Sequence, residues 1–461
     1  MKYTKMYQAI TKVLKNDGEV SFAMSDRTAL MVELWSSMFE GKAPWLNEKV
    51  EDLTLAPAIA GEIARLVTLE LQTKVEGSGR ASYIDRIYQK VVRKARVFSE
   101  YACAKGGLVL KPYASGDSIF VQLIQADSFF PISFDDSGNM TYCVFVEQFR
   151  EGSAIYSRVE SHKLEGNQLT IRNRAFVART EGLLGSEVEI GSIPRWNGLA
   201  AQVVFEGIEK LPLGYFRIPL ANNIDDGSPL GVSVYSRSIG LIREADKRYS
   251  QINWEYESKE TAVHIASSLL KYREDLDKWE YPGGKERLYR SIEYNTGAVD
   301  KPFIDAFSPD IRDASFFNGL NQQLRRIEFN SNLAYGTLSD PNNTDKTAEE
   351  IKASKQRSYS FVADCQGALQ DALEDLVSAI DFWVSIYHLA PPGAYRTSFK
   401  WDDSIIVDEE KDRQTDRADV AMGAMSLWEY RMKWYGETEE QAKAAIKESQ
   451  IREETALFQE E

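Results

Sequence analysis

The sequence predicts a mainly helical α+β protein with one antiparallel β region. Apolar residues recur at three- and four-residue steps through residues 1–105 and again after residue 231, as they do on one face of a helix. In residues 106–220 the period falls to two, and turn sequences separate short β-rich runs. A further helical pattern starts at Thr347 and meets no proline before Pro391. Short strands joined by hairpin turns indicate an antiparallel sheet and not βαβ units.

The first 220 residues are predicted to fold as helices followed by strands. The apolar spacing gives helices at Ala29–Phe39, Ala58–Leu71 and Ser82–Ala104, and Val75–Arg80 interrupts the helical pattern. The β-rich runs give strands at Leu108–Leu110, Ile119–Leu123 and Tyr142–Val146. Asp135 and Asp136 stand in a Ser-Gly-Asn turn, so we interpret them as turn-forming residues and not as metal ligands.

Two helices with a mixed segment between them are predicted next. The first is Val232–Ala262. The second begins after Ser308, which is a suitable N-cap before a first-turn proline, and its pattern stops at Tyr335–Gly336. Residues 337–346 are polar and have no periodicity. They join this helix to the long helical pattern from Thr347, whose first residues resemble a capping box.

The long helix carries two seams of residues spaced by seven. One seam is Val362, Leu369, Leu376 and Trp383, and the other is Ser358, Cys365, Ala372, Ala379 and Ile386. Such seams usually pack against other helices, often in neighbouring subunits. The alternative is a core helix of an all-α domain. Beyond it we expect a strand at Tyr395–Trp401 and helices at Thr415–Trp434 and Thr438–Ile451.

Composition and charge place limits on partners. Of 461 residues, 43% are apolar and 27% charged, which is ordinary for a globular protein of two or three domains. Apolar runs fall short of the ~20 residues of a membrane span and no signal peptide is seen, so we expect no membrane partner. The net charge is −15, and residues 401–461 hold 17 acids against 8 bases. That balance disfavours tight duplex binding but not a surface along which DNA slides.

The sequence offers no recognisable catalytic or metal-binding motif. Its cysteines are three and widely spaced, which excludes a disulfide framework and predicts buried thiols. His162, His264 and His388 lie in separate segments without a ligand partner at suitable spacing. Hydrolase, dinucleotide-binding and zinc-protease signatures are missing. We therefore expect a protein that is not an enzyme and has no cofactor.

Four stretches in a fixed order resemble the portal proteins of tailed bacteriophages, particularly those of siphophages of Gram-positive hosts. Each stretch is weak alone, and the ordered set is specific. They are Trp35–Trp45; Gly185–Val188 with Ile193–Trp196; Tyr215–Pro219 with Ala221–Asn223, Ser228–Gly231 and Ser233; and Phe307–Arg312 with Gly336 and Lys346–Glu350.

This resemblance implies a dodecameric ring at one capsid vertex, assembled in the host cytoplasm, through which double-stranded DNA is packaged, retained and ejected. The implied partners are the terminase large subunit, the major capsid and scaffolding proteins and the head–tail connector. The implied parts are a wing (1–230, with helices in 1–105 and the sheet in 106–220), a stem helix (231–262), a clip (263–308), a second stem helix (309–335), a tunnel loop (336–346), the long helix with a return strand (347–400) and an acidic helical crown (401–461).

The resemblance also implies which residues meet DNA. A conduit must contact phosphate weakly and without sequence preference, and neutral polar side chains suit that task. The loop residues expected to face DNA are Thr337, Ser339, Asn342, Asn343, Thr344 and Lys346. Arg325 and Arg326 are candidate channel cations, with intersubunit salt bridges as the equal alternative. The alternative functions are a soluble α+β enzyme with an unrecognised site and a head–tail adaptor or minor capsid protein.

Overall fold

The computed structural model describes residues 3–19, 21–180, 182–258, 262–266, 271–273, 278–280, 289–292, 304–307, 310, 312–340, 348–401 and 409–447. Helices combine with antiparallel sheet, so the predicted α+β class is confirmed. The chain forms two compact units. The first is Met1–Leu69 with Thr73–Phe399, and the second is Glu70–Gln72 with Lys400–Glu461.

Five helices open the first unit. They are α1 (Tyr3–Asn16), α2 (Asp26–Phe39), α3 (Leu55–Thr68), α4 (Gly79–Val92) and α5 (Ala95–Lys105). The single helix predicted at Ser82–Ala104 is wrong, because the chain turns between α4 and α5. The amide of Lys94 donates to the carbonyl of Val91 at 2.8 Å and closes that turn. Apolar spacing continues across the turn, so the pattern could not register the change of direction.

Two antiparallel sheets follow the helices. The smaller sheet has the order β10-β2-β3, and the larger has the order β4-β5-β6-β7-β8, with β9 paired to the other half of β7. Their strands are β2 (Gly107–Ser115), β3 (Ser118–Gln125), β4 (Phe129–Phe134), β5 (Met140–Glu151), β6 (Ala154–Glu165), β7 (Gln168–Ala178), β8 (Ser186–Val188), β9 (Gln202–Glu206) and β10 (Gly214–Arg217). Asp135 accepts from the amides of Ser137 and Asn139 at 2.9 and 2.8 Å, as expected of a turn-former.

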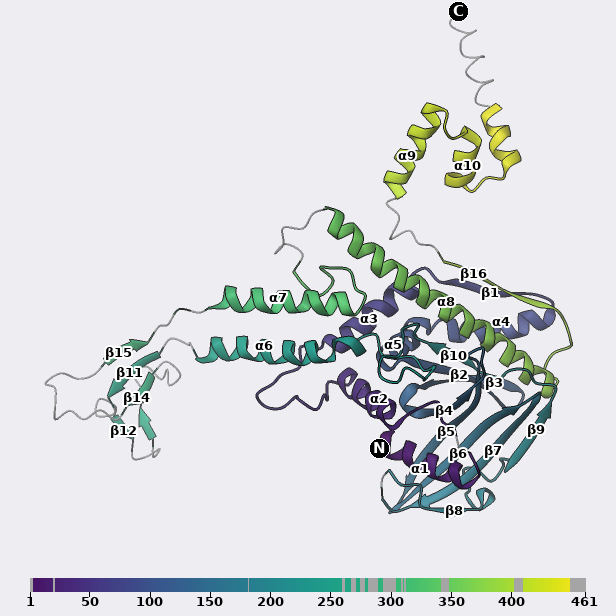
Figure 1. Ribbon diagram of the computed structural model, residues 1–461, viewed down its shortest axis with the longest axis horizontal. Helices are drawn as coiled ribbons and strands as arrows, with labels where there is room; N and C mark the ends of the chain where they lie inside the picture. Colours follow the sequence, from purple (N-terminus) through teal and green to yellow (C-terminus); the bar gives the residue numbers. More distant parts are fainter. Residues whose placement is uncertain are drawn as a thin grey trace, which may run out of the picture. The chain divides into compact units, whose positions relative to one another are not determined.

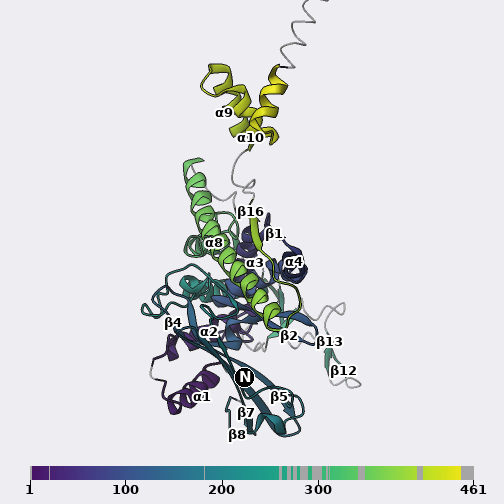
Figure 2. The ribbon, with the colours of Figure 1, turned by 90° about the vertical axis from the view of Figure 1, so that its right-hand side faces the viewer.

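Helix α8 (Ala348–Ile386) is one uninterrupted helix of 39 residues, as predicted. It packs on β10, β2 and α3 within the chain, and Figures 1 and 2 show it alongside α3 and α4. All seam residues except Trp383 and Ile386 are buried there. The prediction that the seams pack against other helices is confirmed in part, since α3 covers α8 together with β10 and β2. Packing of these seams against a neighbouring subunit is not what the structure shows, because most seam residues are already buried within the chain. Small seam residues instead admit strand backbone, since a Cβ on Gly214 would lie 2.2 Å from the carbonyl oxygen of Ala372.

The strand predicted at Tyr395–Trp401 is confirmed as β16, but its partner β1 was not predicted. Strand β1 (Gln72–Gly77) pairs with β16 (Tyr395–Lys400), where only an interruption of the helical pattern had been expected around residue 75. Close by, Arg80 is buried and donates to the carbonyl oxygens of Asp381 and Ala390 at 3.0 and 3.2 Å, besides its ion pair with the Asp381 carboxylate. Arg80 thus ties α4 to the C-terminal end of α8.

Helices α6 (Ile239–Ser258) and α7 (Asp313–Asn330) form an antiparallel pair (Figure 1). The helix predicted from Val232 starts only at Ile239, after a 3-10 turn at Ser236–Ser238. The preceding residues are held outside the helix, because the amide of Val234 donates to the carbonyl of Cys103 at 3.0 Å and the hydroxyl of Tyr235 to that of Trp35 at 2.9 Å.

Short strands connect α6 to α7. They are β11 (Ala262–Ala266), β12 (Lys271–Arg273), β13 (Lys278–Glu280), β14 (Tyr289–Ile292) and β15 (Ile304–Phe307). Strand β11 pairs in parallel with β14 and antiparallel with β15, and β12 pairs with β13. The sequence had predicted no defined element here, because the runs are too short to establish a period.

The second unit is helical. It holds α9 (Glu409–Met422), α10 (Leu427–Tyr435) and a helical stretch over residues 439–447. The single helix predicted at Thr415–Trp434 is wrong: Gly423 has a φ of 76°, and a capping box of Ser426 and Glu429 starts α10. The helix predicted from Thr438 begins with a capping box, in which Thr438 and Gln441 make reciprocal bonds of 3.0 and 3.3 Å.

Two further expectations can be compared with the described residues. Cys103, Cys143 and Cys365 are free and buried, as predicted, and burial raises the pKa of each thiol. No helix in the described ranges is both long and apolar enough to cross a membrane.

The contact between α8 and β10 can be tested by Gly214→Ala. The added methyl group would overlap the backbone of Ala372, so we expect a loss of about 1–3 kcal/mol in the free energy of unfolding. Urea unfolding measures this. Gly191→Ala is the matched control, because a Cβ there meets no atom within 4 Å. Equal stability of the two variants would contradict the close approach.

Candidate functional site

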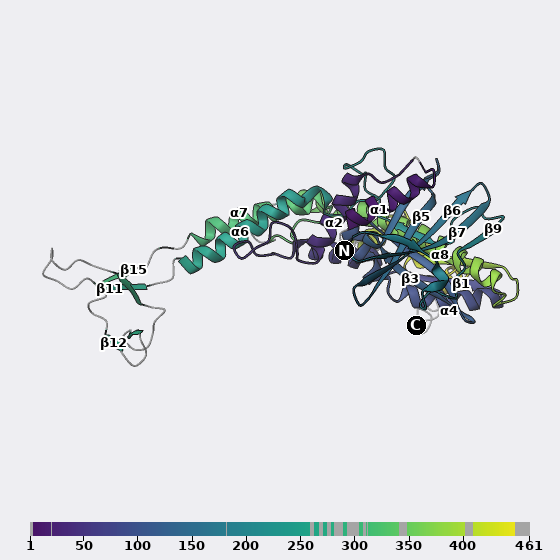
Figure 3. The ribbon, with the colours of Figure 1, turned by 90° about the horizontal axis from the view of Figure 1, so that it is seen from below.

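The α6–α7 pair is tied together at both ends. Near the sheets, Gln323 on α7 donates to the carbonyl of Leu241 at 2.8 Å, and the hydroxyls of Ser238 and Ser331 lie 3.0 Å apart. At the other end Arg312 donates twice to the buried Glu255, at 3.1 and 3.2 Å. Figure 3 shows the two helices side by side from a second direction. The pair is therefore a defined support for the loop that leaves α7.

The carboxylate of Glu328, near the end of α7, holds the first part of that loop. Glu328 is fully buried. Its Oε1 accepts from the amides of Gly336, Leu338 and Ser339 at 3.1, 2.6 and 2.8 Å. Its Oε2 accepts from the hydroxyl of Ser339 at 2.9 Å. A buried carboxylate surrounded by amide donors is satisfied without a cation.

The predicted DNA-facing residues divide into three groups. Thr337 is exposed, although its hydroxyl donates to the carbonyl of Ala334 at 2.6 Å. Ser339 is only 4% exposed and is bonded to Glu328, so it anchors the loop and does not present its hydroxyl to a partner. The remaining expected contacts lie outside the described residues; they are Asn342, Asn343, Thr344 and Lys346.

Arg357 links α8 to the same region. Its guanidinium lies 4.4 Å from the ring centre of Phe329 and 5.4 Å from that of Tyr335, and it donates to the carbonyl of Leu333 at 3.1 Å. Neither Glu328 nor Arg357 was identified from the sequence. One signal was present for Glu328: an acidic residue follows Ile327 on the apolar face of the predicted helix, where only a satisfied charge is tolerated.

The two candidate channel cations differ in exposure. Arg325 is half-buried and already engaged within the chain. Arg326 is exposed and makes no ion pair with any residue that the structure describes. Asn318, Gln322 and Arg326 are exposed and four residues apart on α7, so they form one row. The row therefore presents two amides and one cation along one face of the helix.

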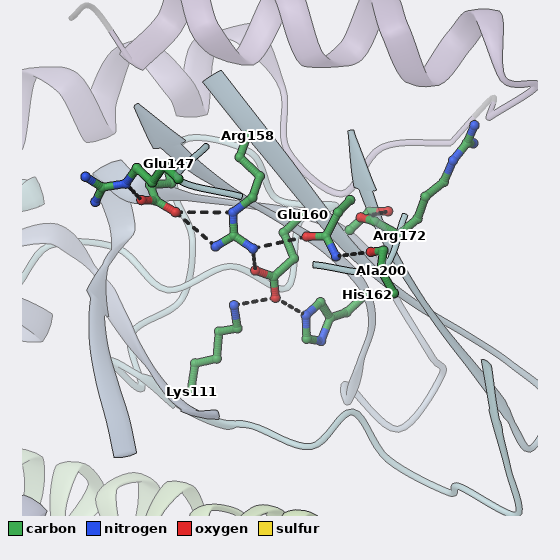
Figure 4. Close-up of polar contacts among 10 residues, drawn as sticks. Lys111, Glu147, Arg158, Glu160, His162, Arg172 and Ala200 are labelled. Atoms are coloured by element: carbon green, nitrogen blue, oxygen red, sulfur yellow. Dashed lines mark hydrogen bonds and ion pairs between the residues drawn. The ribbon is translucent and has the colours of Figure 1, made fainter. Parts of the chain in front are cut away.

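A buried ionic cluster on β2, β5 and β6 is the candidate site for the alternative function as an enzyme (Figure 4). The carboxylate of Glu160 pairs with Lys111, with Arg158 at 3.0 Å and with His162 at 2.6 Å. Arg158 continues to Glu147 at 3.1 Å. The cluster borders a cavity of about 420 Å³ that Lys105 and Asp127 also line.

The protonation of this cluster indicates a structural role. Burial opposes the charge of Glu160, but Lys111, His162 and Arg158 together hold the pKa of that carboxyl well below its usual range. Burial lowers the pKa of His162, and the bond to Glu160 offsets this only in part. Glu160 therefore stays ionised and His162 neutral at pH 7, so neither is poised for proton transfer. In the described ranges, no three His, Cys, Asp or Glu side chains gather in a way that could hold a metal.

The segment from Trp35 to Trp45 connects to α6. Trp35 is fully buried, and the indole of Trp45 donates to Asp246 at 2.8 Å. The amide of Leu53 donates to the same carboxylate at 3.0 Å. Burial raises the pKa of Asp246, and these two bonds partly counter it. One of the four resembling stretches therefore positions the helix pair.

Comparison with known families agrees with these features. The model of the family described as "Phage portal protein, SPP1 Gp6-like" matches residues 75–456, which is most of the chain. No curated protein sequence matches the chain.

The cluster around Glu160 predicts a stability that depends on pH. Glu160→Gln leaves Lys111 buried without its anion and removes one of the two carboxylates that pair with Arg158, so we expect a loss of about 3–5 kcal/mol at pH 7. The carboxylate is favoured in the fold, so its contribution is complete above the unfolded pKa of about 4.3 and is lost as pH falls below it. Urea unfolding at pH 7 and pH 3 measures this. The difference in the free energy of unfolding between wild type and Glu160→Gln should be smaller at pH 3 than at pH 7.

The control for that measurement is Glu187→Gln at the surface. Glu187 is half-exposed and pairs with Arg174 at 2.6 Å, so its removal should cost about 1 kcal/mol or less. If Glu160→Gln cost no more than this control, or if its cost were the same at both pH values, the cluster would not carry the stability assigned to it.

Proposed function

Because the chain belongs to the SPP1 Gp6-like family of phage portal proteins, we propose that its copies form the ring through which double-stranded DNA enters and leaves one capsid vertex. In this proposal the ring serves packaging, retention and ejection of the genome, and it contains about twelve subunits. It docks the terminase large subunit during packaging and the head–tail connector afterwards. A siphophage of a Gram-positive host is the proposed source.

The open sides of the α6–α7 pair are the observation that carries the proposal. Two helices can cover only one face of each other. Trp254 on α6 and Phe317 on α7 remain 63% and 48% exposed. Large apolar side chains on an otherwise polar helix pair favour burial against another chain. A contact repeated from copy to copy about an axis closes into a ring.

The surface for that contact differs from the one expected from the sequence. The seams of α8 are occupied by β10, β2 and α3 within the same chain. We propose that the α6–α7 pair, and not the seams of α8, contacts the neighbouring subunits. We therefore assign the helices 239–258 and 313–330 to the stem. The wing comprises residues 1–230, and residues 347–400 return the chain to it. Residues 263–308 are assigned to the clip, which would meet the terminase and the connector, and 401–461 to the crown.

Two features are proposed to meet the DNA. One is the exposed row of Asn318, Gln322 and Arg326 on α7. The other is the tunnel loop, of which Thr337, Asn342, Asn343, Thr344 and Lys346 are the contact residues. Neutral amides and hydroxyls with a few cations bind phosphate weakly, which permits sliding. We assign Arg326 to the channel, with a salt bridge to the neighbouring subunit as the competing role.

We propose a structural role without catalysis, in which ATP hydrolysis belongs to a separate terminase chain. The buried cluster around Glu160 supports this, since its charged groups are committed to one another. The capsid and scaffolding proteins are the proposed partners during assembly.

Electron microscopy with light scattering tests the assembly. The purified protein should give annular particles with a central hole and a mass of about twelve chains. Because some rings need a scaffold to form, the same measurement is made with the phage scaffolding protein present. A monomer or dimer under both conditions would contradict the proposed ring.

Arg326→Gln separates the two roles proposed for this residue. If Arg326 faces the channel, rings keep their mass and thermal stability while DNA retention falls and depends less on salt, because fewer counterions are released. If Arg326 bridges subunits, ring stability falls instead. Arg86→Gln, on α4, is the control for removal of an exposed arginine. Packaging and retention are measured as nuclease-protected DNA per particle.

A further inference from the structure

We propose that Glu328 is a positioning residue that fixes where the DNA-facing part of the tunnel loop begins. It holds residues 336–339 on α7, and Asn321 holds residue 340, so that only residues 341–347 are left to reach α8. This inference rests on the proposed function of the loop. Its two anchoring residues, Glu328 and Asn321, are singled out neither by the sequence motifs nor by the family match.

The carboxylate of Glu328 makes the anchor hard to release. It accepts four hydrogen bonds, all from the loop. Three come from the amides of Gly336, Leu338 and Ser339, and one comes from the hydroxyl of Ser339. The side chain is fully buried. If residues 336–339 lifted away, a buried carboxylate would lose those partners, which is among the costlier defects in a protein. The anchored arrangement is therefore strongly favoured over a loop that is free from Gly336 onward.

A second bond gives the anchored segment a direction. The amide of Asp340 donates to the side-chain oxygen of Asn321 at 2.8 Å. Asn321 and Glu328 are seven residues apart, so they lie on the same face of α7, about 10 Å apart along its axis. The segment is bonded first to Glu328 and then to Asn321. The loop thus runs back along α7 before it leaves for α8.

Arg357 on α8 contacts the residues that precede the anchored segment. By stacking on Phe329 and Tyr335 it joins α8 to the end of α7 and to the residue just before the anchored amides. The start of the loop is therefore fixed relative to both helices. The loop residues left to contact DNA are the exposed Thr337 and those beyond Asp340, and Ser339 belongs to the anchor.

Hydrogen–deuterium exchange on the assembled full-length protein tests the anchor. In Glu328→Ala, the amides of Gly336, Leu338 and Ser339 should exchange about tenfold faster or more, because bonds to a charged acceptor are lost. In Glu328→Gln the retained oxygen still accepts from these amides and the hydroxyl of Ser339 can turn to accept, so the change should be about threefold or less. Asn321→Ala should affect the amide of Asp340 alone.

The matched control is Glu255→Gln. It alters another buried carboxylate of the same helix pair, one that bonds Arg312 and none of the loop residues 336–340 that the structure describes. It should leave exchange at residues 336–340 unchanged. If Glu328→Ala likewise left this exchange unchanged, the proposal would be overturned. Should Glu328→Ala fail to assemble, Glu328→Gln combined with Asn321→Ala must raise exchange throughout 336–340 for the proposal to stand.

Packaging assays distinguish this inference from the proposed function. A variant lacking residues 341–344 should form rings but package or retain less DNA, and Glu328→Ala should show the same defect, partly rescued in Glu328→Gln. If the shortened variant is defective and Glu328→Ala packages normally, the positioning role is wrong while the loop keeps its function. If the shortened variant itself packages normally, the proposed function of the loop fails.

Discussion

The direct contact between α8 and the backbone of β10 organises the first unit. Gly214 has no side chain and Ala372 a small one, so helix and strand approach more closely than side chains would otherwise permit. The contact sets the position of a helix of 39 residues, which Arg80 ties to α4 at one end and Arg357 ties to α7 at the other. Because α8 is one continuous helix over this length, the sheet region and the loop after α7 are connected through one element.

Two buried carboxylates show how this chain satisfies charge in different ways. Glu160 is surrounded by cations, and its cluster connects three strands of the two sheets. Glu328 is surrounded by backbone amides, which fix one short segment in one path. A cation on a long side chain can follow small movements, whereas several amides of one segment accept only one arrangement. The first solution suits a sheet core and the second suits a loop that must start at a defined place.

The helix pair α6–α7 supplies the surfaces through which neighbouring copies would contact one another in the proposed ring. It is joined to the rest of the first unit through Tyr235 and Asp246, and Gln323 and Arg312 tie its two helices together near the ends. Its sides stay open, with Trp254 largely exposed. A pair that is fixed at its base and open at its sides can bind identical neighbours on both flanks without a change in its own fold. The polar row that includes Arg326 lies on the same pair, so assembly and DNA contact would depend on the same two helices.

The sequence by itself determined the class of fold, the one long helix, the antiparallel strands and the family, because these depend on apolar period, turn residues and ordered short motifs. Tertiary structure decided what those elements touch. A seven-residue seam looks the same whether a helix or a strand covers it, and only the tertiary structure shows that β10 packs on the seam of α8, with Gly214 against Ala372. Likewise Ser339 reads as a polar loop residue until Glu328, eleven residues earlier, is seen to bind it. Local pattern carries no information on such pairings, because they depend on where separate elements meet in space.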